Sequence, residues 1–150
     1  MPNFTNTRTT VIDAPAATIH ALINDFHEWT TWSPWEGLDP ELKRTYSGAA
    51  AGVGADYAWE GNSKAGTGTM AITSSTPDRI DIALEFLKPF KASNVATFTF
   101  AETGSGTKVD WTMSGERNVA FAVLGKLFFD KAIAKDFDKG LASLKAAAEG

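Results

Sequence analysis

The spacing of apolar residues changes along the chain from the period of a helix to the period of a strand. One stripe of a predicted amphipathic helix is formed by four apolar residues three and four positions apart, namely Ile19, Leu22, Ile23 and Phe26. A β-branched run over residues 7–12 precedes this helix and predicts a short strand. We expect Asp13 to cap the helix and Pro15 to begin it, because proline has the φ angle of a first helical turn. The helix is expected to end near Phe26.

Apolar and polar residues alternate from Lys43 onward, which is the period of strands with one buried face. Turn signals rich in glycine, proline, asparagine and aspartate divide this region into about six consecutive strands. Three strands have clear same-face sets, which are Val53, Ala55, Tyr57 and Trp59, then Ile80, Ile82, Leu84 and Phe86, then Val109, Trp111 and Met113. Because short turns join consecutive strands, the pattern predicts an antiparallel meander, with Gly66 and Gly68 as bulge or curvature positions.

The C-terminal region, residues 119–149, has no proline and many good helix formers, and predicts one long helix or two helices joined end to end. Its apolar side is marked by Val123, Leu127, Ala134, Phe137, Leu141 and Leu144. Residues 29–35 contain Pro34 and β-branched residues, and predict a loop or a single helical turn. One apolar sheet face covered by a long helix is an α+β arrangement, and we expect residues 1–150 to form a single domain.

Charge and composition exclude several classes of function. The net charge is −4 and the 14 Lys and Arg residues are scattered along the chain, so we expect no nucleic-acid partner. The absence of cysteine excludes disulfides, thiolate nucleophiles and cysteine-ligated metals. Two histidines without a third ligand make no recognisable metal site, and no glycine motif has the strand–turn–helix context of a nucleotide cofactor. We therefore expect neither metal nor cofactor.

The sequence contains neither a signal peptide nor an apolar run of about 18 residues, the length that a membrane span requires. These features predict a cytoplasmic protein without stable membrane insertion.

A series of landmarks runs in order along nearly the whole chain: Phe26, Trp29, Trp32-Ser33-Pro34-Trp35, Asp39-Pro40, residues 52–62, residues 66–70, Phe129-Asp130-Lys131, residues 136–141 and Leu144-Lys145. In these landmarks the chain resembles the START-like (SRPBCC), helix-grip superfamily, in its polyketide cyclase/dehydrase-like branch. The resemblance implies a curved antiparallel sheet wrapped around a long C-terminal helix, with a short N-terminal helical region. It also implies a cavity that in relatives holds lipids, sterols, polyketides or other hydrophobic molecules. Some relatives catalyse cyclisation or dehydration, whereas others only bind, transport or contact protein partners.

Aromatic and other apolar side chains are the candidate cavity wall, because ligand sites are usually lined by such groups with a few polar ones. The candidates are Trp29, Trp32, Trp35, Tyr57, Trp59, Met70, Phe86, Trp111 and Phe121. Each ring has an alternative role in the packed core. Buried indole N–H and phenol O–H groups need partners, so we expect one or two of these residues to face a wet cavity.

Two aspartates are candidate catalytic residues. Asp130 falls in the middle of the apolar stripe of the C-terminal helix, where a carboxylate facing the sheet would serve as general acid or ligand anchor. Alternatively, the helix breaks at Phe129 and Asp130 caps its second half. Asp25 lies next to His27 and Glu28 where the first helix ends, and a carboxylate there can orient the imidazole for proton transfer. The alternative for this group is a solvated helix end.

Three functions are consistent with these features. The favoured one is a carrier or sensor that binds a small hydrophobic molecule, such as a lipid, a polyketide or an aromatic compound. The second is a cofactor-free enzyme of the cyclase or dehydratase kind, with Asp130, Asp25 or Tyr57 transferring protons. The third is a module that binds another protein through the rim of the sheet. Residue types leave the identity of the ligand and the oligomeric state open.

Overall fold

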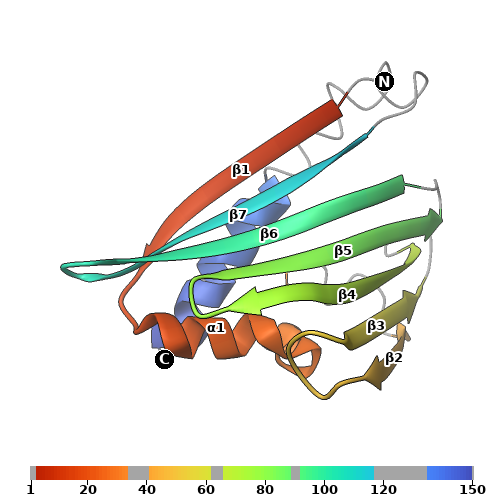
Figure 1. Cartoon of the computed structure of the whole chain (residues 1–150), viewed down its shortest axis with the longest axis horizontal. Helices are drawn as coiled ribbons and strands as arrows, with labels where there is room; N and C mark the ends of the chain where they lie inside the picture. The colour runs from red at the N-terminus through yellow and green to blue at the C-terminus, as the bar shows by residue number, and fades with distance from the viewer. Residues whose placement is uncertain (1–2, 34–40, 62–65, 89–91, 117–134, 150) are drawn as a thin grey trace.

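A computed structural model of the chain describes residues 3–33, 41–61, 66–88, 92–116 and 135–149 (Figure 1). The strands are β1 (Asn3–Ile12), β2 (Lys43–Gly48), β3 (Ala55–Glu60), β4 (Thr67–Thr76), β5 (Arg79–Lys88), β6 (Ala92–Thr103) and β7 (Gly106–Glu116). They form one seven-stranded sheet in the order β1-β7-β6-β5-β4-β3-β2, and every pairing is antiparallel. Strands β2 to β7 are therefore the predicted meander, and β1 extends it by pairing with β7.

The helices are α1 (Ala16–Asn24), the 3-10 helix η1 (Phe26–Thr31) and the C-terminal helix, which is described over residues 135–149. In Figure 1 the C-terminal helix crosses behind β7 and β6, and α1 lies below the strands. Buried residues of all three helices join the inner-face residues of the sheet in one hydrophobic cluster. We call the face of the sheet that carries this cluster the inner face.

Two predictions about α1 are wrong. The helix ends at Asn24 rather than Phe26, because Asp25 is extended (φ −123°, ψ 114°) and begins η1 as its N-cap. Asp13 does not cap α1, since Pro15 occupies the N-cap position and Asp13 precedes it by two residues, too early to reach the first amides of the helix. The backbone N–H of Asp13 instead donates to Glu149 Oε2 at 2.8 Å.

The predicted strand faces agree with the burial of side chains, with one exception. Residues paired directly across two antiparallel strands share a face. The buried inner-face positions include Ile80, Ile82, Leu84, Ala96, Phe98, Phe100, Val109, Trp111 and Met113. Val53 was expected to share a face with Ala55, but it lies in the turn before β3 and is 59% exposed. Gly52 and Gly54 have φ angles of +73° and +94°, so the turn continues up to the start of β3.

The sheet bends along the pairing of β4 with β5. The register shifts between Thr67 and Gly68 and again between Ile72 and Ser74. Because a bulge increases local twist and bends the strand, these shifts contribute to the curvature of the sheet. The predicted curvature position at Gly68 is confirmed.

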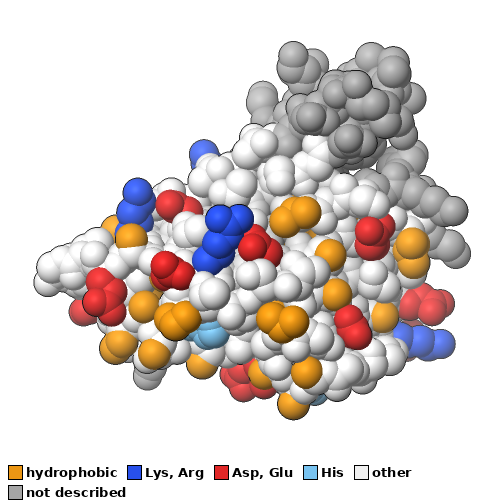
Figure 2. Space-filling view, viewed as in Figure 1, with side chains coloured by type: hydrophobic (Ala, Val, Ile, Leu, Met, Phe, Trp, Pro, Cys, Tyr) orange, Lys and Arg blue, Asp and Glu red, His pale blue; other side chains and the backbone are white. Residues whose placement is uncertain are grey.

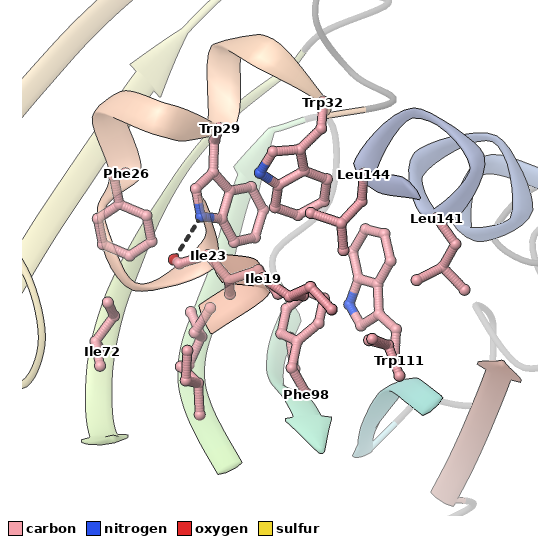
Figure 3. Packing of buried hydrophobic residues seen from close by; sticks show 14 of the residues in the cluster. Ile19, Ile23, Phe26, Trp29, Trp32, Ile72, Phe98, Trp111, Leu141 and Leu144 are labelled. Atoms are coloured by element: carbon pink, nitrogen blue, oxygen red, sulfur yellow. Dashed lines mark hydrogen bonds between the residues drawn. The ribbon is translucent and has the colours of Figure 1, made fainter. Parts of the chain in front are cut away.

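The packed core lies where η1 and the C-terminal helix meet β6 and β7 (Figure 3). Its central contacts join Trp29 to Trp32 (ring centroids 4.5 Å apart), Phe98 to Trp111 (4.9 Å) and Trp111 to Phe137 (4.0 Å). Each large ring removes about 150–250 Å² from water, which contributes on the order of 4–6 kcal/mol at ~25 cal/mol per Å². Large rings of the described part of the C-terminal helix and of η1 thus pack directly against those of β6 and β7.

Candidate ligand-binding site

Three tryptophans predicted to contact a ligand are buried in the hydrophobic cluster, and their contact with a ligand stays a prediction. Trp32 and Trp111 are each 1% exposed, and Trp29 is 5% exposed. The Nε1 of Trp29 donates to the carbonyl of Ile23 at 2.8 Å (Figure 3). The Nε1 of Trp32 donates to the carbonyl of Leu22, also at 2.8 Å. These carbonyls lie in the last turn of α1, where a helix leaves carbonyl groups without intrahelical partners. The helix end thus satisfies two indole N–H groups, so neither requires a wet cavity.

A second aromatic group, on β2, β3 and β5, is less covered. We call it the aromatic row, and it consists of Tyr46, Tyr57, Trp59 and Phe86. Consecutive ring centroids lie 5.2, 6.1 and 6.0 Å apart. Tyr57 is buried, but Tyr46, Trp59 and Phe86 are only half-buried although they lie on the inner face. The row therefore presents partly open ring surface beside the core, and it contains the predicted site residues Tyr57, Trp59 and Phe86.

Gly68 makes room for the indole of this row. It pairs with Trp59 on one side and Phe86 on the other. A Cβ atom at position 68 would lie 2.4 Å from Cη2 of Trp59 and 2.4 Å from the carbonyl oxygen of Glu85. The indole thus lies across the glycine backbone, and a larger residue would displace it.

A polar side chain that the sequence analysis did not single out lies beside the aromatic row. Asn94 is 5% exposed and pairs with Leu84 and Gly115 on the inner face. Its Oδ1 is buried and accepts no hydrogen bond from the residues that the structure describes. Met70 is one of the predicted site residues. It is buried and pairs with Leu84 from β4, whereas Asn94 pairs with Leu84 from β6. The signal that would have identified Asn94 is its alternation with the inward-facing Ala96 and Phe98.

Asp25 and His27 lie at the Tyr46 end of the row. Asp25 Oδ1 accepts the backbone N–H of His27 at 2.9 Å and lies 2.8 Å from Nδ1 of the same residue. The imidazole stacks on Tyr46, with centroids 3.9 Å apart and planes 17° apart. Asp25 therefore caps η1 and orients the imidazole at the same time, and its role in proton transfer stays a prediction.

Three candidate residues, Trp35, Phe121 and Asp130, lie outside the described residues. Whether Asp130 faces the sheet or caps a helix stays a prediction, as do the ligand contacts of the other two. Within the described ranges, no three His, Asp or Glu side chains cluster as a metal site requires. No helix in those ranges is long and apolar enough to cross a bilayer.

An open hollow of about 320 Å³ lies between the β6–β7 turn and the start of α1. It is lined by Asp13, Ala14, Pro15, Glu102, Thr103, Ser105, Gly106 and Thr107. This end of the sheet is far from β2 and β3 (Figure 1). Its mainly polar lining does not suit a hydrophobic ligand.

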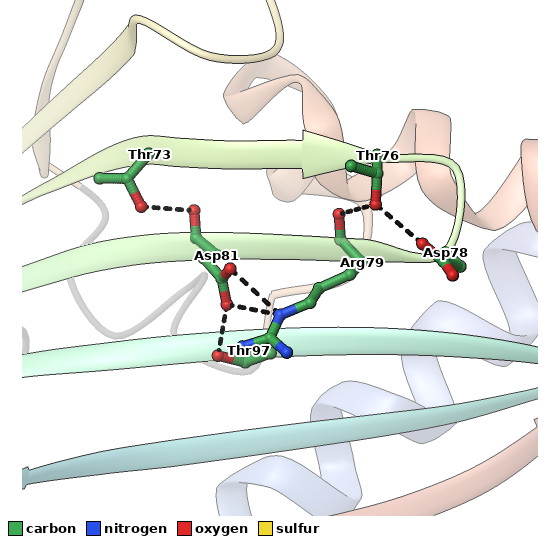
Figure 4. Close-up of polar contacts among 6 residues, drawn as sticks. All are labelled: Thr73, Thr76, Asp78, Arg79, Asp81 and Thr97. Carbon is green, nitrogen blue, oxygen red and sulfur yellow. Dashed lines mark hydrogen bonds and ion pairs between the residues drawn. The ribbon is translucent and has the colours of Figure 1, made fainter.

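The outer face of the sheet is polar. Asp81 accepts hydrogen bonds from Arg79 Nε at 3.1 Å and from Thr97 Oγ1 at 2.8 Å, which links β5 to β6 (Figure 4). Figure 2 shows apolar side chains scattered singly among polar and charged groups on this side. A broad apolar patch would mark a protein-binding surface, and the face in this view does not present one.

Comparison with known proteins identifies both sequence and structural similarity. The family model described as polyketide cyclase/dehydrase and lipid transport matches residues 3–149. A search of curated proteins found no significant match. Protein CV1439 from Chromobacterium violaceum has a similar structure, with a TM-score of 0.69 and 17% identity over 99% of both chains.

Two di-domain ARO/CYC proteins are also similar in structure. BexL, from the BE-7585A biosynthetic pathway, has a TM-score of 0.75 and 20% identity over 99% of this chain and 50% of its own. StfQ, from the steffimycin biosynthetic pathway, has a TM-score of 0.74 and 11% identity over 98% of this chain and 51% of its own. The chain therefore spans about half the length of each. These similarities confirm the predicted helix-grip fold, a curved antiparallel sheet with a C-terminal helix and short N-terminal helices.

Proposed function

Since this chain belongs to the polyketide cyclase/dehydrase and lipid transport family, we propose that it binds a small hydrophobic molecule against the aromatic row, as a carrier or sensor. Membership of the family supports a ligand-binding or cyclase role. The ligand class that suits the row is a lipid, a polyketide or an aromatic compound, because its contacts would be mostly apolar with few polar groups.

The observation that carries this proposal is the partial exposure of Tyr46, Trp59 and Phe86 on the inner face, where the neighbouring core residues are buried. The exposed part of each ring forgoes the free energy of burial, at ~25 cal/mol per Å² of apolar surface. A flat or flexible apolar ligand covering the rings would recover part of that free energy and add ring contacts worth about 0.5–1.5 kcal/mol each.

Binding can be tested directly with 2-naphthol and palmitate as probes, by calorimetry and by the shift of the melting temperature. We expect Trp59→Leu to weaken binding about tenfold, which corresponds to ~1.4 kcal/mol. The matched control is Val95→Ala, since Val95 is 45% exposed on the opposite face of the sheet, and its affinity for the probes should equal that of the wild type. Equal affinities in Trp59→Leu and the wild type would exclude the aromatic row as the site.

A second candidate function is favoured by the contact between Asp25 and His27. A neutral imidazole that donates from Nδ1 to the carboxylate carries its lone pair on Nε2, which is the arrangement of a general base. This supports a cofactor-free cyclase- or dehydratase-like activity on a ligand bound along the row. The imidazole already stacks on Tyr46, so it lies at the end of that surface.

The enzyme hypothesis is tested with a molecule retained by the purified protein and identified by mass spectrometry. Turnover of that molecule should fall by about 10²–10⁴ in His27→Gln if the imidazole transfers a proton. Asp25→Asn is the matched variant, because asparagine caps a helix about as well as aspartate but lacks the charge. Unchanged turnover in both variants would leave only the binding function.

A further inference from the structure

Asn94 is a polar side chain in an apolar part of the inner face. It is 5% exposed, and its Oδ1 accepts no hydrogen bond from the described residues. Buried polar atoms in folded proteins almost always have partners, so an exception needs a physical explanation. An amide oxygen kept without a partner is a ready acceptor for a donor that enters from outside the chain.

Asn94 lies on β6 at the boundary between the packed core and the aromatic row, and its Oδ1 points from there toward Gly115 on β7. Along β6 its inward neighbour is the buried Ala96, and across the strands it pairs with the buried Leu84. Phe86, which belongs to the aromatic row, lies on the same face of β5, two residues from Leu84. Diagonal neighbours of this kind are about 7–8 Å apart, within reach of one small ligand.

Gly115 leaves room for the amide of Asn94, because it has no side chain. A Cβ atom at position 115 would lie 2.2 Å from Asn94 Oδ1, so the oxygen occupies the space that such a side chain would take on the inner face. The carbonyl oxygen of Ser93 would lie 3.0 Å from the same Cβ. The amide oxygen therefore lies over the backbone of β7 at Gly115.

We propose that Asn94 is the polar anchor of the ligand site, and that its Oδ1 accepts a hydrogen bond from a hydroxyl group of an otherwise apolar ligand. This inference rests on the proposed function, since it assumes that the ligand covers the aromatic row. It narrows the ligand class to phenols and alcohols. A site with a buried acceptor discriminates strongly against analogues that lack the donor, because the acceptor is then left unpaired.

The test compares three probes of nearly equal shape by calorimetry: 2-naphthol, 2-methoxynaphthalene and 2-methylnaphthalene. Only the first carries a donor. We expect the wild type to bind 2-naphthol at least tenfold more tightly than either analogue. Asn94→Leu, which replaces the amide by an apolar group of similar size, should abolish that preference by weakening 2-naphthol alone. Asn94→Ala should do the same and serves if the leucine variant does not fold.

Trp59→Leu separates this inference from the proposed function, because it should weaken all three probes to a similar extent. If the wild type binds the three probes equally and Trp59→Leu weakens them all, the anchor role is overturned and the aromatic site stands. If 2-methoxynaphthalene binds as tightly as 2-naphthol, or the preference persists in Asn94→Leu and Asn94→Ala, the acceptor role is also overturned. Failure of all three probes to bind the wild type would overturn both proposals.

Discussion

The indole of Trp111 lies flat against the ring of Phe137, with centroids 4.0 Å apart and planes 6° apart. Trp111 belongs to β7 and Phe137 to the C-terminal helix, and both are buried. Beside them, the guanidinium of Arg8 on β1 forms an ion pair with Asp138 at 2.6 Å. The helix is thus joined to the sheet by an aromatic stack inside and by an ion pair at the surface.

We predict that Phe137→Ala lowers the free energy of unfolding by about 3–5 kcal/mol, because it removes a buried ring and leaves a cavity against Trp111. Urea denaturation at constant pH measures this loss. Arg8→Ala is the control, since the side chains of its ion pair are 44% and 53% exposed and exposed pairs contribute little. Losses of equal size in the two variants would contradict the internal stack as the main connection.

A second prediction concerns the indole N–H groups that bind the end of α1. Trp32→Phe keeps most of the ring but leaves the carbonyl of Leu22 without the donor that now lies 2.8 Å away. Because this bond is part-buried, we expect a loss of about 0.5–1.5 kcal/mol in unfolding free energy, the net contribution of a typical intramolecular hydrogen bond.

The control for Trp32→Phe is Thr30→Ala in the same 3-10 helix. Thr30 Oγ1 donates to the carbonyl of His27 at 3.1 Å, but this bond is exposed, so water can replace it and the change should stay within about 0.5 kcal/mol. A loss in Trp32→Phe no larger than in Thr30→Ala would refute the role of the indole N–H.

The strands could be predicted from the sequence because a sheet with one buried face requires apolar and polar residues to alternate along each strand. Ile80, Ile82 and Leu84 alternate with polar residues, and all three are buried. The end of α1 could not be predicted in this way. Phe26 is buried and continues the helical spacing, yet the extended Asp25 interrupts the helix and η1 then brings Phe26 into the core. The spacing of apolar residues stays the same when one residue leaves the helical conformation, so it cannot predict such a break in a helix.

The candidate site was predicted less completely, for a related reason. Residue type indicates that the N–H groups of Trp29 and Trp32 need acceptors, but it does not indicate that the end of α1 supplies them. Asn94 is polar and was passed over, because its inward direction follows only from its register with Leu84 and Gly115. Pairing between distant strands, rather than residue type, determines which side chains border the aromatic row.

A third prediction is a pH dependence that arises from Glu149. Its hydrogen bond from Lys145, and then that from the backbone N–H of Asp13, hold the pKa of this carboxyl below its ordinary value of about 4.5. At pH values between the lowered pKa and the ordinary one, the unfolded state therefore binds more protons than the folded state, and stability rises with pH. The stabilisation is fully present above the ordinary pKa and is lost as the pH falls through the lowered one.

Unfolding by urea at pH 7 and pH 3 measures this effect. Glu149→Gln should reduce the difference in stability between the two pH values, because the amide does not titrate. Lys145→Ala should reduce it as well, since it removes the main cause of the lowered pKa. An unchanged pH dependence in Glu149→Gln would show that other carboxylates account for the acid sensitivity.

The last prediction concerns the packing of Asn94 Oδ1 over Gly115. Gly115→Ala should destabilise the protein, because the new Cβ would lie 2.2 Å from Asn94 Oδ1 and 3.0 Å from the carbonyl oxygen of Ser93. In an Asn94→Ala background the first of these clashes is absent, so the same substitution should be less costly. We expect a coupling free energy of about 0.5–3 kcal/mol in a double-mutant cycle of unfolding free energies. Effects that add to within about 0.3–0.5 kcal/mol would mean that the amide does not lie over Gly115, which would remove the geometric basis for its role as an acceptor.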